Sequence, residues 1–75
     1  MESAVDVLTN FEENDKWLSA NYETLKKRYD NQWVAVFHKA VIDHDSDLKK
    51  LVKRLRTKHA KVYNEIAVDY VTSEA

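Results

Sequence analysis

Three aspartates at alternate positions are the residues whose spacing comes closest to that of a metal site. Asp43, Asp45 and Asp47 match the spacing of the first three ligands of a calcium-binding loop. Such a loop also needs glycine at its sixth position and glutamate at its twelfth, where this chain has Leu48 and Arg54. We therefore predict no metal here and expect residues 45–47 to begin a helix instead.

The histidines and serines show no arrangement typical of catalysis. His44 followed by Asp45 resembles a fragment of a metal phosphohydrolase site, but the further histidine and aspartate ligands of such a site are missing. We expect His38, His44 and His59 to lie in a turn, at a strand end and on a helix, and no serine stands in a nucleophile motif. The sequence thus predicts a protein that is not an enzyme and that holds no metal and no cofactor.

A run of basic residues is the strongest hint of a binding function. Residues 47–61 hold seven basic residues and one aspartate, a net charge of +6, whereas residues 1–25 hold six acidic residues and one lysine, a net charge of −5. The basic residues are Lys49, Lys50, Lys53, Arg54, Arg56, Lys58 and Lys61. Such a face could follow phosphates, so nucleic-acid binding is one candidate function. The acidic remainder and the lack of an aromatic platform with interleaved arginine argue against a dedicated nucleic-acid binder.

Length and composition limit the fold and its surroundings. The 75 residues suffice for one small domain, residues 1–75, and without cysteine it has no disulfide. The absence of glycine excludes the glycine-rich phosphate loops of nucleotide sites. No apolar run approaches the roughly 20 residues of a membrane span, and no signal peptide precedes the charged N-terminus, so we expect a cytoplasmic protein. Because so small a core is marginal, self-association is also expected.

Two stretches have the apolar spacing of amphipathic helices. Residues 15–29 predict a helix with Asn14 as its N-cap and Asp30-Asn31 at its end, because asparagine tolerates a left-handed backbone. A second helix is predicted from Asp47 to residue 58 or 59, with Ser46 as its N-cap. The apolar stripes are Leu18, Tyr22, Leu25 and Tyr29 on the first helix and Leu48, Leu51, Val52, Leu55 and His59 on the second. Residues 1–10 and 72–75 are expected to be loose.

The stretch from Trp33 to His44 crowds β-branched and aromatic residues together and predicts a β-hairpin. Its strands run over residues 33–37 and from residue 40 to 43 or 44, joined by a two-residue turn at His38-Lys39. This turn places Phe37 opposite Ala40, Val36 opposite Val41 and Ala35 opposite Ile42. It also requires positive φ at two residues that are not glycine, at about 1–2 kcal/mol each, so either this strain is tolerated or the loop is longer than two residues. Alternating apolar residues predict a third strand over residues 65–71.

Together these elements predict an α+β fold in the order helix–strand–strand–helix–strand. A right-handed crossover gives a three-stranded sheet of order two-one-three, with strand one central and both helices on one face. The other face would then expose Val34, Val36 and Val41 unless the N-terminal segment or a second subunit covers it. An all-α three-helix bundle is the alternative, because the same apolar residues also fit helical spacing.

The stretch from Asn21 to Leu55 resembles a family of very small, uncharacterised prokaryotic proteins, a domain of unknown function. The residues that carry the resemblance are NYETL, WVAV and the Asp-Leu pair at Asp47-Leu48. This chain has Asp30-Asn31 where the family has Pro-Gly, His38-Lys39 where it has Asp-Gly, and Asp45 where it has Gly. The resemblance implies the same helix–strand–strand–helix–strand order and no activity.

The sequence alone therefore favours a non-enzymatic protein-interaction module. It would form a homodimer, or dock on a protein partner, through Val34, Val36 and Val41 on the helix-free sheet face or through the edge of the third strand. The alternative is nucleic-acid binding through the basic second helix. Partner identity, cellular process and oligomeric state are not encoded in any recognisable pattern.

Overall fold

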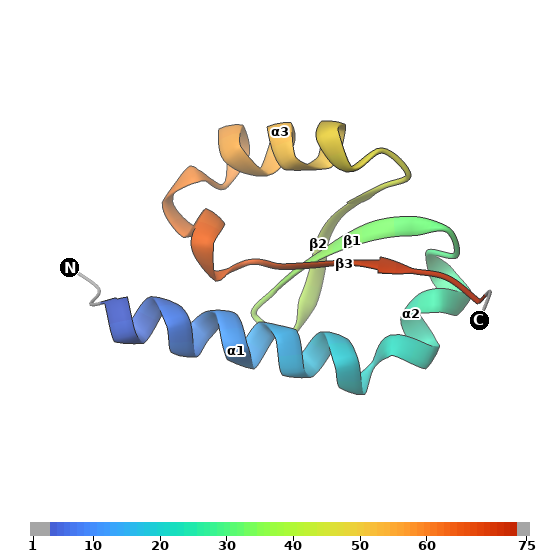
Figure 1. Cartoon of the computed structure of the whole chain (residues 1–75), viewed down its shortest axis with the longest axis horizontal. Coiled ribbons are helices and arrows are strands. Elements are labelled where there is room, and N and C mark those ends of the chain that lie inside the picture. Colours follow the sequence, from blue (N-terminus) through green and yellow to red (C-terminus); the bar gives the residue numbers. More distant parts are fainter. Residues whose placement is uncertain (1–3, 74–75) are drawn as a thin grey trace.

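The structure is a computed structural model that describes residues 4–73 and combines helices with one antiparallel sheet (Figure 1). The elements in chain order are α1 (Ala4–Ala20), α2 (Tyr22–Arg28), β1 (Gln32–Phe37), β2 (Ala40–Asp45), α3 (Leu48–Lys58), the 3-10 helix η1 (Ala60–Glu65) and β3 (Ala67–Val71). The predicted α+β class is confirmed, and the all-α alternative is wrong.

The sheet has three strands in the order β2-β1-β3, as predicted, and β1 pairs antiparallel with both neighbours. Phe37 lies opposite Ala40 and Val36 opposite Val41, which confirms the predicted register beside the turn. Beyond Val36 the register shifts, so Ala35 lies opposite Asp43 and not opposite Ile42 as predicted. The shift is a β-bulge, which inserts one unpaired residue into a strand.

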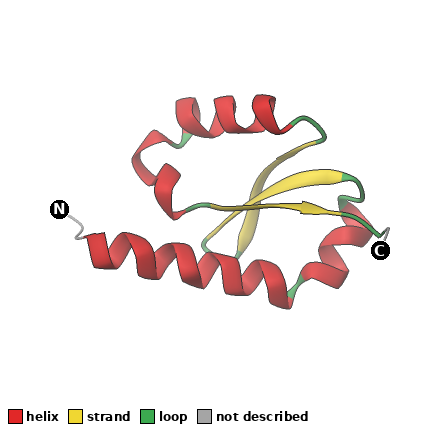
Figure 2. Ribbon diagram, viewed as in Figure 1, coloured by secondary structure: helices red, strands yellow, loops and turns green. Residues whose placement is uncertain are grey.

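Helices cover both faces of the sheet, so the prediction of two helices on one face is wrong (Figure 2). Because side chains alternate along a strand, the central strand β1 contributes to both cores. On one face α1 and α2 bury Leu18, Leu25, Val34, Val36, Ala67 and Val71. On the other, α3 and η1 bury Ala35, Leu51, Leu55 and Ile66.

The first helix starts earlier than predicted and breaks in the middle. Residues 4–10, expected to be loose, form the start of α1, and Asn14 is a buried residue inside this helix and not its N-cap. The break comes at Asn21, whose side-chain Nδ2 donates to the carbonyl of Trp17 at 2.8 Å. Asn31 then takes the expected left-handed conformation, with φ of 61°, before β1.

The start of α3 and the end of the chain also differ from prediction. Asp47, not Ser46, caps α3, because its Oδ1 accepts the backbone N–H of Lys49 at 2.9 Å. The predicted strand over residues 65–71 begins at Ala67, and the 3-10 helix before it was not predicted. Ser73, expected to be loose, donates through its backbone N–H and its hydroxyl to Asp30. Residues 1–3 and 74–75 of the segments expected to be loose lie outside the described residues.

The glycine-free hairpin turn is held by Asn14. His38 and Lys39 have φ of 51° and 59°, so of the two expected possibilities the strained two-residue turn is the one the chain adopts, and not a longer loop. The Oδ1 atom of Asn14 accepts the backbone N–H of His38 at 2.9 Å, and its Nδ2 atom donates to the carbonyl of Glu65 at 2.8 Å. Asn14 is 4% exposed, so one buried side chain joins α1 to the turn and to the end of η1.

Candidate functional site

The three valines predicted to form an interface belong to the core. Val34 and Val36 have no exposed surface, and Val41 is half-buried against the same cluster. Leu18 and Leu25 pack in that cluster, so α1 and α2 occupy the sheet face that was expected to be free. Within residues 4–73 the sheet therefore has no helix-free face, and these valines do not form an exposed surface.

The edge of β3, the second predicted interface, is partly occupied by the chain's own side chains. Asp69 Oδ1 accepts the backbone N–H of Tyr70 at 2.8 Å, and the Tyr22 hydroxyl lies 3.5 Å from the Tyr70 carbonyl. The same hydroxyl accepts the backbone N–H of Thr72 at 3.3 Å. Backbone groups bonded in this way are not available to a further strand, which is how natural sheets protect their edges.

The edge of β2 is occupied in the same way, by Arg54 of α3. Asp43 Oδ1 accepts the backbone N–H of His44 at 2.8 Å, and Arg54 Nη2 donates to the His44 carbonyl at 3.0 Å. Arg54 Nε donates to Asp43 Oδ2 at 2.9 Å and its Nη1 to Asp45 Oδ2 at 2.8 Å. We call this group the Arg54 clamp, and it fixes α3 to the strand that precedes it.

The clamp sets the protonation of its members. Hydrogen bonds from Arg54 hold the pKa of Asp43 below its ordinary value, and the backbone N–H of Asp47 followed by Arg54 does the same to the pKa of Asp45. The two carboxylates in turn raise the pKa of Arg54. The aspartates with calcium-loop spacing are thus engaged with a guanidinium and, at Asp47, with the start of α3. Within residues 4–73, no three histidine or carboxylate side chains are grouped to hold a metal ion.

Two of the three histidines, His38 and His44, take the positions expected for them. His38 lies in the turn and packs against Phe37, with ring centroids 4.1 Å apart, whereas His59, expected on the helix, is the C-cap residue that follows α3. His44 lies in β2, where its Nδ1 is 2.7 Å from Gln32 Oε1 and its ring centroid is 4.6 Å from that of Tyr29.

The predicted basic face loses one member to the clamp and keeps the others at the surface. The exposed ones are Lys49, Lys50, Lys53, Arg56, Lys58 and Lys61. Along one side of α3 the basic side chains adjoin two apolar ones, and together they line a shallow hollow of about 420 Å³. Its lining is Leu48, Lys49, Val52, Lys53 and Arg56, and we call this surface the α3 flank.

An exposed apolar surface on α1 was missed by the sequence analysis. Val5 is 72% exposed, Leu8 57% and Phe11 37%, and we call these three residues the α1 patch. They lie on the first part of α1, whose N-terminal end extends beyond η1 (Figure 1). The spacing of three residues between Val5, Leu8 and Phe11 is the sequence signal for this surface, but it is too short to distinguish a helix from a loose terminus.

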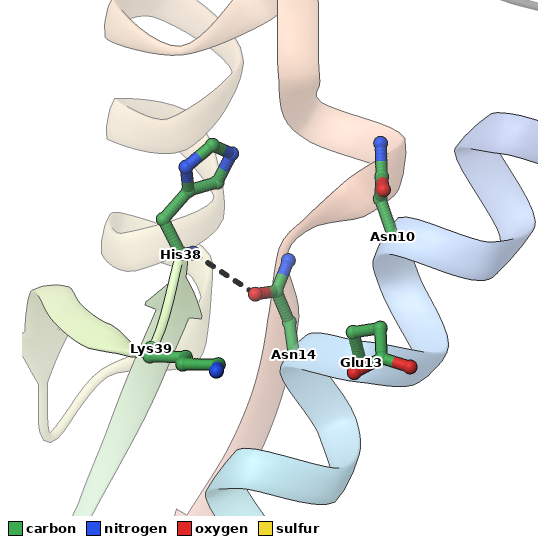
Figure 3. A pocket seen from close by; sticks show the side chains of 5 residues that line it. All are labelled: Asn10, Glu13, Asn14, His38 and Lys39. Atoms are coloured by element: carbon green, nitrogen blue, oxygen red, sulfur yellow. Dashed lines mark hydrogen bonds between the residues drawn. The ribbon is translucent and has the colours of Figure 1, made fainter.

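A second hollow, of about 310 Å³, lies where α1 meets the hairpin turn (Figure 3). It is lined by Asn10, Glu13, Asn14, His38 and Lys39. Both polar atoms of the Asn14 side chain are already bonded, to His38 and to Glu65. The hollow therefore presents mainly the exposed side chains of Glu13, His38 and Lys39, and it does not resemble a preformed ligand pocket.

The fold and its surfaces define a small α+β protein whose three-stranded sheet lies between two helical layers. The chain belongs to a family of unknown function, DUF5678, whose model matches residues 24–68. The match includes α2 from Thr24, the hairpin, α3 and the start of β3, and it leaves out the α1 patch and Asn14. No curated protein and no solved structure matches the chain. Within residues 4–73, no helix is long and apolar enough to cross a membrane.

The Arg54 clamp predicts how stability depends on pH. A carboxylate whose pKa is lower in the folded state stabilises that state above its unfolded pKa, and this contribution is lost as the pH falls through the folded pKa. We therefore expect Arg54→Met to be less stable than the wild type at pH 7, with the difference shrinking below the ordinary aspartate pKa of 3.8. Urea unfolding at pH 7 and pH 3 measures the difference in the free energy of unfolding between the two proteins. A difference that does not change with pH would contradict a stabilising role of the Arg54 clamp. Lys58→Met, at an exposed position of the same helix, is the control.

Proposed function

We propose that this chain is a non-enzymatic protein-interaction module that self-associates through the α1 patch. The observation that carries the proposal is the exposure of Val5 and Leu8, 72% and 57%, beside each other on one helix. Single exposed apolar residues are ordinary, but adjacent ones on a projecting element are typical of interaction sites. Burying them would also add apolar area to a domain of 75 residues, whose own core is small.

The sheet supports the same conclusion, because its faces and parts of its edges are already occupied. The sheet faces are covered by helices, and backbone groups at both sheet edges are bonded to Asp43, Arg54, Asp69 and Tyr22. A further strand would have to displace these side chains, whereas a partner on α1 displaces only water. We therefore place the interface of this module on helix surfaces.

Replacing the two most exposed members of the α1 patch tests the proposal. Val5→Gln combined with Leu8→Gln should keep the fold, because both side chains are exposed, and should abolish self-association. Sedimentation velocity over a rising concentration series should show an increasing sedimentation coefficient for the wild type and a constant, monomeric one for the variant. Thr24→Gln, at an exposed position of α2, should behave as the wild type. A wild type that stays monomeric throughout would overturn the proposal.

Nucleic-acid binding through α3 is a second candidate function. The observation that favours it is the exposure of Lys49, Lys50, Lys53 and Arg56 on one short helix. Fluorescence anisotropy with labelled duplex DNA and RNA should then show binding at low salt that weakens steeply as salt is added, because phosphate contacts release counterions. No binding at the lowest salt concentration would exclude this function.

A further inference from the structure

The outer side of α1 carries an apolar part followed by an acidic part. Val5, Leu8, Glu12 and Asp15 are all exposed, and their spacing of three and four residues places them in one stripe along the helix. We call this the α1 stripe. The whole of α1 holds four acidic residues and one lysine, so its surroundings are negative as well.

The α3 flank also combines apolar and charged side chains, but its charges are positive. Leu48, 36% exposed, and the half-buried Val52 are its apolar part, beside the exposed Lys49 and Lys53. All six charged residues of α3 are basic. A helix that presents apolar and acidic side chains in sequence would thus find both an apolar contact and counter-charges on this surface.

We propose that the α1 stripe of one molecule docks on the α3 flank of a second copy of this chain. The proposal rests on the function proposed above and names the surface that receives the α1 patch. Val5 and Leu8 would bury apolar area against Leu48 and Val52 of the second copy. Glu12 and Asp15 would lie near the second copy's Lys49 and Lys53.

Charge and position together select this pairing. Two α3 flanks facing each other would bring ammonium groups together, two α1 stripes packed in parallel would bring carboxylates together, and both arrangements are repulsive. Within one molecule the two surfaces cannot meet, because α1 and α3 lie on opposite sides of the sheet (Figure 1). A second copy supplies the complementary surface, and the contact should weaken as salt screens its exposed charges.

A charge-exchange experiment tests the pairing. The variants E12K/D15K and K49E/K53E should each self-associate at least roughly tenfold more weakly than the wild type, since favourable exposed pairs become repulsive. An equimolar mixture of the two should recover association, because reversed α1 stripes then meet reversed α3 flanks. Sedimentation velocity measures all three samples, and circular dichroism verifies that each variant is folded.

K27E/K61E is the matched control, because Lys27 and Lys61 are exposed, lie off both surfaces, and give the same change in net charge as K49E/K53E. It should self-associate as the wild type does. If the wild type associates and K49E/K53E associates equally well, or if the mixture does not recover, the pairing is wrong and the function proposed above still stands. A wild type that never associates overturns both.

A measurement on the unaltered chain keeps the test valid if a variant fails to fold. Backbone amide chemical shifts of the wild type should change on dilution at residues 5–15 and 48–53 together. Shifts that change only in α1 would place a different surface against the α1 patch and would overturn the pairing.

Discussion

Asn14 satisfies backbone groups from two distant parts of the chain at once. Its side chain accepts the N–H of His38, 24 residues away, and donates to the carbonyl of Glu65, 51 residues away. Two-residue hairpin turns favour Asn-Gly or Asp-Gly, because glycine adopts positive φ without a steric cost. Here two L-residues take that conformation at about 1–2 kcal/mol each, and the bond from Asn14 helps to hold them there.

The same bond decides how the sheet is covered. By fixing α1 against the hairpin turn and η1, Asn14 sets the helix across the face where Val34 and Val36 lie. On the opposite face, Arg54 fixes α3 to β2 through Asp43 and Asp45. The polar contacts of Asn14 and Arg54 thus position the two helical layers. The apolar faces of these helices then bury the two cores against the sheet. The sides of α1 and α3 that face away from the sheet, which include the α1 patch and the α3 flank, are left exposed in this arrangement.

The sequence predicted the local elements well, because their signals are local. The crowded apolar residues around Val36 indicated a hairpin, the two-residue turn followed from their spacing, and the strand order followed from the crossover. The face that each helix covers was not predictable, because β1 is apolar on both sides and fits either arrangement. Asn14 resembled an N-cap because asparagine is favoured there, and its real partners are too distant in sequence to be recognised.

The free energy of unfolding of Asn14→Ala tests this account most directly. Leaving one buried and one part-buried backbone group unpaired should lower it by about 2–4 kcal/mol, which exceeds the roughly 0.6 kcal/mol that alanine recovers in helix propensity. Asp15→Ala, at the exposed neighbouring position, should change it by less than about 0.5 kcal/mol. Urea unfolding followed by tryptophan fluorescence gives both values. A change for Asn14→Ala no larger than that for Asp15→Ala would contradict the central role of this side chain.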